Sequence, residues 1–166
     1  MNARSEKQGA TVERRSDREL VVTRSIKGPA RLVWDAWTKS ELFVKWWVPP
    51  GAPIKILKHE ADVRVGGKYR LTFGFLPPGD PQARMDVFGT YLEVVPHQKL
   101  KWTNEEDGGG GAVTTLTFDE KDGRTTVVVH DLYPSKQALD EAIASGSTEG
   151  MPASLAQLDE FVATLE

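Results

Sequence analysis

Three histidines are the side chains of this sequence best suited to acid–base chemistry near neutral pH: His59, His97 and His130. His59 is followed by Glu60, and His130 is followed by Asp131, which suggests a metal site built from histidine and carboxylate. No pair has the HxH or HExxH spacing that places two ligands on one metal ion, so we expect no metal and no cofactor. We expect His97 to lie in an exposed turn.

Nucleophilic and redox chemistry find little support in the composition. The chain has no cysteine, which excludes thiol catalysis, disulfides and thiolate metal sites. It also has no Gly-x-Ser-x-Gly elbow. Proton transfer inside an apolar cavity would need a single buried group with a shifted pKa, and His130 or Tyr91 could supply it. The sequence does not decide whether these two side chains face inward. We therefore assign no catalytic residue from the sequence.

Gly66-Gly67 follows Asp62 and Arg64 in a segment that could be mistaken for a phosphate-binding loop. It lacks the Lys-Ser/Thr pair and the glycine spacing of such loops, so it predicts a turn. Asp62 and Arg64 share one strand face and are expected to form a structural ion pair or to cap backbone groups at this turn.

The length of the chain is that of a single domain. The chain has 166 residues, of which 39% are hydrophobic and 27% are charged. Its 21 Lys and Arg against 24 Asp and Glu form no basic stripe, so we expect no nucleic-acid partner. No stretch approaches the roughly 20 apolar residues of a membrane span, and no secretory signal is visible. We expect a protein of the cytoplasm.

Residues 1–18 differ in composition from the rest of the chain. They contain five basic and three acidic residues, and nothing larger than Val12 after Met1 to bury. We expect them to form a disordered N-terminal tail, with one folded domain over residues 19–166.

The elements that position the candidate residues begin with a β-branched strand over residues 20–26, which ends at Gly28-Pro29. Pro29 suits the first turn of a helix, and apolar residues at helical spacing predict a short one after it. A second short helix is expected to run to about Trp46 and to stop at Pro49-Pro50.

From residue 54 to residue 133 the apolar residues alternate with polar ones, as in Tyr69, Leu71 and Phe73. This period of two is typical of strands with one solvated face. Similar runs lie at 86–95, 100–105, 112–118 and 125–131. The run Gly108–Gly111 predicts a hairpin tip. Together they predict an antiparallel meander.

The C-terminal segment returns to helical spacing, first in a short helix around residues 138–143. Leu155, Leu158 and Val162 then lie on one face of a longer helix. The only apolar surface large enough to cover that face is the concave side of the meander. We therefore expect an α+β fold in which a curved antiparallel sheet of about seven strands wraps the C-terminal helix, with two short helices after the first strand.

Several motifs then resemble the family named for activators of the heat-shock chaperone ATPase, within the START-related, Bet v allergen-like (SRPBCC) superfamily. The matching segments are residues 23–38, Trp46 to Pro49, residues 62–69, 89–93, 96–103, 123–130 and 150–158. The resemblance implies a helix-grip fold with a hydrophobic cavity between sheet and helix.

Alternation and helical spacing predict which side chains line that cavity. The expected lining residues are Trp37, Trp46, Tyr69, Leu71, Phe73, Phe88, Leu92, Leu100, Trp102, Leu116, Phe118, Met151, Leu155, Leu158 and Val162. Trp46-Trp47 could instead form an exposed aromatic rim that contacts a chaperone or a second copy of the chain, because two adjacent residues of a short helix do not both point inward.

Three functions remain open at this point. The first is binding of a small hydrophobic or aromatic ligand without a metal or nucleotide. The second is a cyclase- or lyase-like reaction in the same cavity. The third is stimulation of a chaperone ATPase, although the family members that do this usually carry an additional N-terminal domain, for which residues 1–18 are too few.

Overall fold

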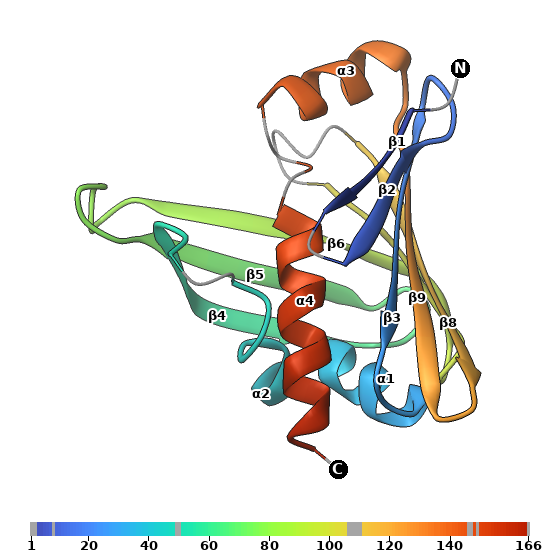
Figure 1. Cartoon of the computed structure of the whole chain (residues 1–166). Coiled ribbons are helices and arrows are strands. Elements are labelled where there is room, and N and C mark those ends of the chain that lie inside the picture. The colour runs from blue at the N-terminus through green and yellow to red at the C-terminus, as the bar shows by residue number, and fades with distance from the viewer. Residues whose placement is uncertain are drawn as a thin grey trace.

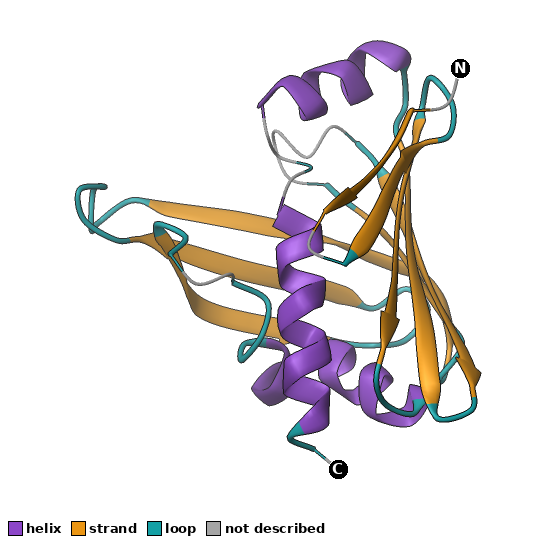
Figure 2. Cartoon of the chain, in the orientation of Figure 1, coloured by secondary structure: helices purple, strands orange, loops and turns teal. Residues whose placement is uncertain are grey.

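The computed structural model describes residues 3–7, 9–48, 51–105, 111–145, 148 and 150–165. Nine strands of this part of the chain form one antiparallel sheet in the order β1-β2-β3-β9-β8-β7-β6-β5-β4 (Figure 2). The strands are β1 (Ala3–Lys7), β2 (Ala10–Arg14), β3 (Glu19–Ile26), β4 (Ile54–Ala61), β5 (Lys68–Phe75), β6 (Arg84–Val95), β7 (Lys99–Thr103), β8 (Val113–Lys121) and β9 (Arg124–Leu132). The helices are α1 (Ala30–Thr38), α2 (Ser40–Phe43), α3 (Lys136–Ser145) and α4 (Gly150–Ala163).

The expected helix-grip architecture is confirmed. Strand β3 is the predicted first strand and β4 to β9 are the predicted meander. The curved sheet wraps around α4, while α1 and α2 close its lower end (Figure 1). None of the described helices is long and apolar enough to cross a membrane. The predicted hairpin tip at Gly108–Gly110 and the helix stop at Pro49-Pro50 lie outside the described residues.

The N-terminal segment differs from the expected disordered tail, because it forms β1 and β2. Val12 lies opposite Val22 in the antiparallel register of β2 and β3, and Ala10 is fully buried. Arg14 forms an ion pair with Asp140 of α3 at 2.7 Å. The expectation was wrong because it counted large apolar side chains, whereas a strand added to a sheet edge gains backbone hydrogen bonds and needs only small side chains to pack.

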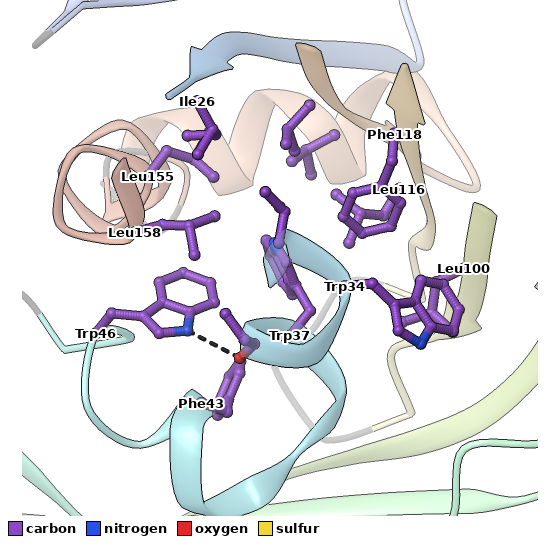
Figure 3. Close-up of a cluster of buried hydrophobic side chains, with 14 of the residues drawn as sticks. Ile26, Trp34, Trp37, Phe43, Trp46, Leu100, Leu116, Phe118, Leu155 and Leu158 are labelled. Atoms are coloured by element: carbon purple, nitrogen blue, oxygen red, sulfur yellow. Dashed lines mark hydrogen bonds between the residues drawn. The ribbon is translucent and has the colours of Figure 1, made fainter. Parts of the chain in front are cut away.

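Helix α4 packs against β2 and β3. Leu155, Leu158 and Val162 are all 0% exposed, as the helical spacing predicted (Figure 3). A Cβ atom on Gly28 would lie only 2.4 Å from Cγ1 of Val162, so the absence of a side chain there allows the close approach of the helix. This half of the core is filled by the protein's own side chains.

The second short helix is shorter than predicted. It ends at Phe43, and residues 44–46 form a turn. Thr38 does not cap it, because its hydroxyl donates to the carbonyl of Trp34 at 2.8 Å instead. The early end changes the direction of the two tryptophans that follow.

The inward face of β6 is shifted by one residue from the alternation predicted. Tyr69 lies opposite Gly89 and Arg70 opposite Phe88, so Phe88 shares the convex face with Arg70, whose guanidinium carbon lies 4.7 Å above its ring. Gly89 occupies the inward position because a Cβ there would lie 2.9 Å from the Tyr69 ring and even closer to the carbonyl of Thr103. Predicting Phe88 as a cavity residue was therefore wrong.

Leu92 is the second incorrect inward assignment on β6. The register shifts between Tyr91 and Glu93, which is a β-bulge, and Leu92 at the bulge is 42% exposed. Tyr91 faces inward and is 6% exposed. His130 alternates with the buried Val129 and faces outward.

Candidate functional site

Eight ring-bearing side chains from the short helices and the neighbouring strands form a connected set of ring contacts. We call them the aromatic cluster. They come from α1, α2, the turn after α2, and the strands β4 to β7: Trp37, Phe43, Trp46, Trp47, His59, Tyr69, Tyr91 and Trp102.

Trp37 is the centre of this cluster. Its ring centroid lies 4.8 Å from Trp46, 5.7 Å from Trp47 and 6.2 Å from Trp102. Trp102 in turn contacts Tyr69 at 6.4 Å, edge to face. These are the separations at which aromatic rings attract each other beyond the burial of their surfaces.

Trp46 and Trp47 both contact Trp37, which corrects the expectation that only one of them could point inward. The turn after Phe43 breaks the helical geometry on which that expectation depended. Trp46 is 1% exposed and its Nε1 donates to the carbonyl of Ala36 at 2.9 Å (Figure 3). A partner surface cannot reach the Trp46 ring in this conformation, and only the half-buried Trp47 presents part of a ring to solvent.

Two polar residues of α4 hold the turn that carries these tryptophans. Ser154 Oγ donates to the carbonyl of Trp47 at 2.6 Å. Gln157 Nε2 donates to the carbonyls of Trp46 and Val48, each at 2.7 Å. The position of the Trp47 ring is therefore set by the same helix that fills the core.

Two buried nitrogens of the aromatic cluster lack hydrogen-bond partners among the described residues: Nε1 of Trp37 and Nδ1 of His59. Both rings contact Phe43, Trp37 at 6.2 Å and His59 in a stacked arrangement at 4.4 Å. Burial lowers the pKa of His59, so its imidazole is neutral near pH 7. The cluster thus combines apolar ring surface with an indole donor and an imidazole nitrogen that no described group uses.

A row of polar side chains crosses the concave face beside the cluster. The Tyr69 hydroxyl lies 2.9 Å from the carbonyl of Thr103 and 3.4 Å from Oδ1 of Asn104. Asn104 Nδ2 donates to Thr114 Oγ1 at 3.0 Å, and Thr114 donates to Asp131 Oδ1 at 2.5 Å. Burial raises the pKa of Asp131. Tyr69 belongs both to the aromatic cluster and to this polar row.

The predicted cavity residues fall into three groups. Trp37, Trp46, Tyr69 and Trp102 join the aromatic cluster. A second set belongs to the packed hydrophobic core rather than to an open lining: Leu71, Phe73, Leu100, Leu116, Phe118, Leu155, Leu158 and Val162, each no more than 6% exposed, with the half-buried Met151 against them. Phe88 and Leu92 lie outside both sets.

A depression of about 340 Å³ in the described part of the chain lies where β4, β5 and β6 run side by side. It is lined mainly by charged side chains, among them Glu60, Lys68, Arg70 and Glu105. Phe88 contributes to it from the convex face. This is an open depression with charged side chains around two aromatic rings, Tyr69 and Phe88, rather than the enclosed apolar cavity that the sequence predicted.

The histidines are far apart in the sheet. His59 lies on the edge strand β4 and His130 on β9, where it lies 2.7 Å from Glu19 of β3. This contact lowers the pKa of Glu19. Among the described residues, no three His, Asp or Glu side chains lie close enough together to hold a metal ion. The expected ion pair of Arg64 and Asp62 is present at 2.7 Å.

Sequence reasoning missed most of the polar residues of the site. Thr114 and Asp131 occupy inward positions on strands whose neighbouring inward residues, Leu116 and Val129, are buried and apolar. A polar residue at an inward position is a signal that alternation alone could have provided. Ser154 and Gln157 carry no such signal, because their role depends on where α4 meets the turn after α2.

Comparison with known proteins agrees with this architecture. A protein of Nitrosomonas europaea has a similar structure, with 22% identity, a TM-score of 0.78, and coverage of 90% of this chain and 97% of that chain. A protein of Rhodobacter sphaeroides has 19% identity and a TM-score of 0.80 over 100% of both chains. An AHSA1-like protein of Aeromonas hydrophila has 17% identity and a TM-score of 0.65, over 87% of this chain and 93% of that one.

At these identities the similarity establishes the fold alone. A search of curated proteins gives no sequence match. The family described as Activator of Hsp90 ATPase homolog 1-like protein matches residues 27–163, from the end of β3 to the end of α4. Because this match spans most of the sequence, the chain belongs to the Activator of Hsp90 ATPase homolog 1-like family.

Proposed function

We propose that the protein binds a small hydrophobic or aromatic ligand at the aromatic cluster, and that the ligand contacts the half-buried faces of Trp47, Tyr69 and Trp102. The chain has a fold that often binds hydrophobic ligands. The closed part of the core is filled by side chains that are fully buried, so a ligand would gain most contact where the rings are still partly exposed.

The observation that carries this proposal is the pair of unpartnered nitrogens on Trp37 and His59. Native proteins leave very few buried polar atoms without a hydrogen bond, because each costs about 1–3 kcal/mol. Both nitrogens are covered in the ligand-free conformation. A ligand that displaces a neighbouring side chain and offers an acceptor to the Trp37 indole, or a matching group to His59, would recover that free energy. Ring surface and unused polar atoms lie together in the aromatic cluster, which is the usual composition of a small-molecule site.

A thermal-shift screen tests the proposal directly. The panel contains 1-methylnaphthalene and other bicyclic aromatics, sterols and fatty acids. A ligand present at 100 times its Kd stabilises the fold by about 2.7 kcal/mol, so a binder raises the Tm measurably. In a ¹⁵N correlation spectrum, the indole resonance of Trp37, assigned from the Trp37→Phe variant, should shift when the ligand is added.

Two matched variants locate the binding site. Trp102→Leu removes a half-buried ring of the aromatic cluster and should weaken binding of the hit compound at least tenfold. Phe88→Ala removes a half-buried ring from the convex face and should leave the affinity unchanged. If no compound of the panel raises the Tm, or if Phe88→Ala and Trp102→Leu weaken binding equally, the proposal is wrong.

A further inference from the structure

Four neighbouring strands place an aromatic ring and a carboxyl group in one line on the concave face. In the register of the sheet, Tyr91 lies opposite Trp102, Trp102 opposite Thr114, and Thr114 opposite Asp131. Register partners project from the same face of a sheet. Two strand spacings separate Trp102 from Asp131, or about 10 Å between their backbones.

The hydrogen bonds along this line all run towards Asp131. Asn104 donates to Thr114, and Thr114 uses its single proton to donate to Asp131 Oδ1. No described residue donates to Oδ2, and no described Lys or Arg side chain forms an ion pair with this carboxyl group. Asp131 is half-buried, so its carboxyl group has lost part of its hydration. The hydrogen bond from Thr114 and the charge that the neighbouring His130 carries when protonated offset part of that loss.

The carboxyl group of Asp131 has different surroundings on its two sides. Beyond it in the same register lies Leu20, which belongs to a small apolar cluster with Tyr133 and Leu139 of α3. Burial and the nearby Asp131 raise the pKa of Tyr133 to about 12, so its phenol stays neutral and adds no charge to the site. One side of the carboxyl group is therefore apolar, and the other side faces Thr114 and the rings beyond it.

We propose that Asp131 is the polar anchor of the ligand site, and that the ligand is an aromatic or hydrophobic molecule that also carries a hydrogen-bond donor, an amine or a hydroxyl group. The inference rests on the proposed function, because it names the chemical class of the same ligand. An N–H or O–H group of the ligand donates to Oδ2, which accepts no hydrogen bond from the described residues. An ammonium group adds a charge-assisted hydrogen bond.

Four naphthalene probes with the same ring separate the two proposals: 1-methylnaphthalene, 1-naphthylmethanol, 1-naphthylmethylamine and 1-naphthoic acid. Their affinities are measured by isothermal titration calorimetry. The alcohol and the amine should bind at least about tenfold more tightly than the hydrocarbon, as expected for one hydrogen bond to a charged group. The naphthoate should bind more weakly than the hydrocarbon, because two carboxylates would face each other.

Asp131→Asn is the decisive variant, and Asp119→Asn is its control. Asp119 lies on β8 and is exposed, so its substitution removes one negative charge without touching the site. In Asp131→Asn, 1-naphthylmethylamine should bind no more tightly than 1-methylnaphthalene. The affinity for 1-methylnaphthalene itself should be unchanged, which also shows that the variant is folded. Asp119→Asn should retain the advantage.

The outcomes distinguish the two proposals. If the hydrocarbon binds but the amine and the alcohol have no advantage in the native protein, or keep it in Asp131→Asn, the anchor is wrong and the aromatic site stands. If none of the four probes binds, while the screen described above also finds no ligand, both proposals fail.

Discussion

The two ends of the concave face differ in how completely the protein covers them. Where α4 and α1 cover β3, β8 and β9, the inward side chains Leu116 and Val127 are 0% exposed. On β6, Met85 also faces inward, opposite the buried Phe73, yet it is 42% exposed. Strands β4, β5 and β6 extend beyond α4 on the left of Figure 1. We call the first region the closed half and the second the open wing.

This difference suits the closed half to stabilising the fold and the open wing to binding a ligand. In the closed half, apolar side chains from the helix and the sheet already pack against each other, so a ligand would bury little further apolar surface there. Along the open wing, apolar surface remains in contact with water, and its removal from water would favour association. The aromatic cluster lies at the junction of the two regions, where Trp37 is buried but Trp47 and Trp102 are only half covered.

The largest expected effect is at the centre of the closed half. Leu158→Asp places a carboxylate without a partner where the side chain is 0% exposed, at a cost of several kcal/mol, comparable to the whole stability of a domain. We expect loss of the cooperative thermal transition in circular dichroism. The control is Leu92→Asp at the exposed bulge of β6, which should keep its transition. A cooperatively folded Leu158→Asp variant would show that the α4 stripe is not essential.

Deletion of residues 1–14 tests the part of the closed half that the sequence did not predict. It removes the fully buried Ala10 and uncovers the edge of β3. We expect a lower Tm in differential scanning calorimetry, by several degrees for each 1–2 kcal/mol lost. An unchanged Tm would mean that β1 and β2 contribute nothing to stability, in agreement with a disordered tail.

A matched pair of truncations measures the contrast between the two regions. Leu116→Ala in the closed half should cost about 2–5 kcal/mol, because it leaves a cavity in a filled core. Met85→Ala in the open wing should cost less than about 1 kcal/mol, because the side chain is 42% exposed. Urea denaturation gives both values. Equal costs would contradict the division into a closed half and an open wing.

The smallest effect is expected at Asp131, and it depends on pH. Burial raises the pKa of this carboxyl group above its unfolded value, so folding favours the protonated form. The charged form is thus a cost that is present at neutral pH and disappears as the pH falls below the ordinary carboxyl pKa of about 4.

Without ligand, Asp131→Asn should therefore raise the Tm at pH 7 and change it less near about pH 4. The exposed Asp119→Asn variant should show no such pH-dependent gain. A lower Tm for Asp131→Asn at pH 7 would show that the hydrogen bond from Thr114 outweighs the cost of burial.

The sheet and the grip on α4 could be predicted from local patterns. Alternation on β5 correctly placed Leu71 and Phe73 inward, and the spacing of Leu155, Leu158 and Val162 correctly identified the buried helix face. Both patterns work because an element with one apolar side must bury that side, whatever covers it.

The face of β6 could not be predicted in the same way. On β6, apolar residues occur at both odd and even positions, so alternation does not identify the inward face. The inward position opposite Tyr69 must be a glycine, Gly89, because the Tyr69 ring and the Thr103 carbonyl occupy the space of a side chain. That requirement comes from two neighbouring strands, and the bulge at Leu92 then shifts the register again.

From residue 19 onwards, the amino-acid sequence by itself determined the type and order of the elements, because propensity and periodicity act over neighbouring residues. Only the tertiary structure decided that β1 and β2 extend the sheet, that Gln157 holds the turn of Trp46, and that Asp131 lies in line with Trp102. The contacts of Gln157 and Asp131 join segments distant in the chain, and β2 pairs with a β3 that is itself held by β9. The free energy of all three features depends on burial and hydrogen bonding that exist only once the sheet has closed around α4.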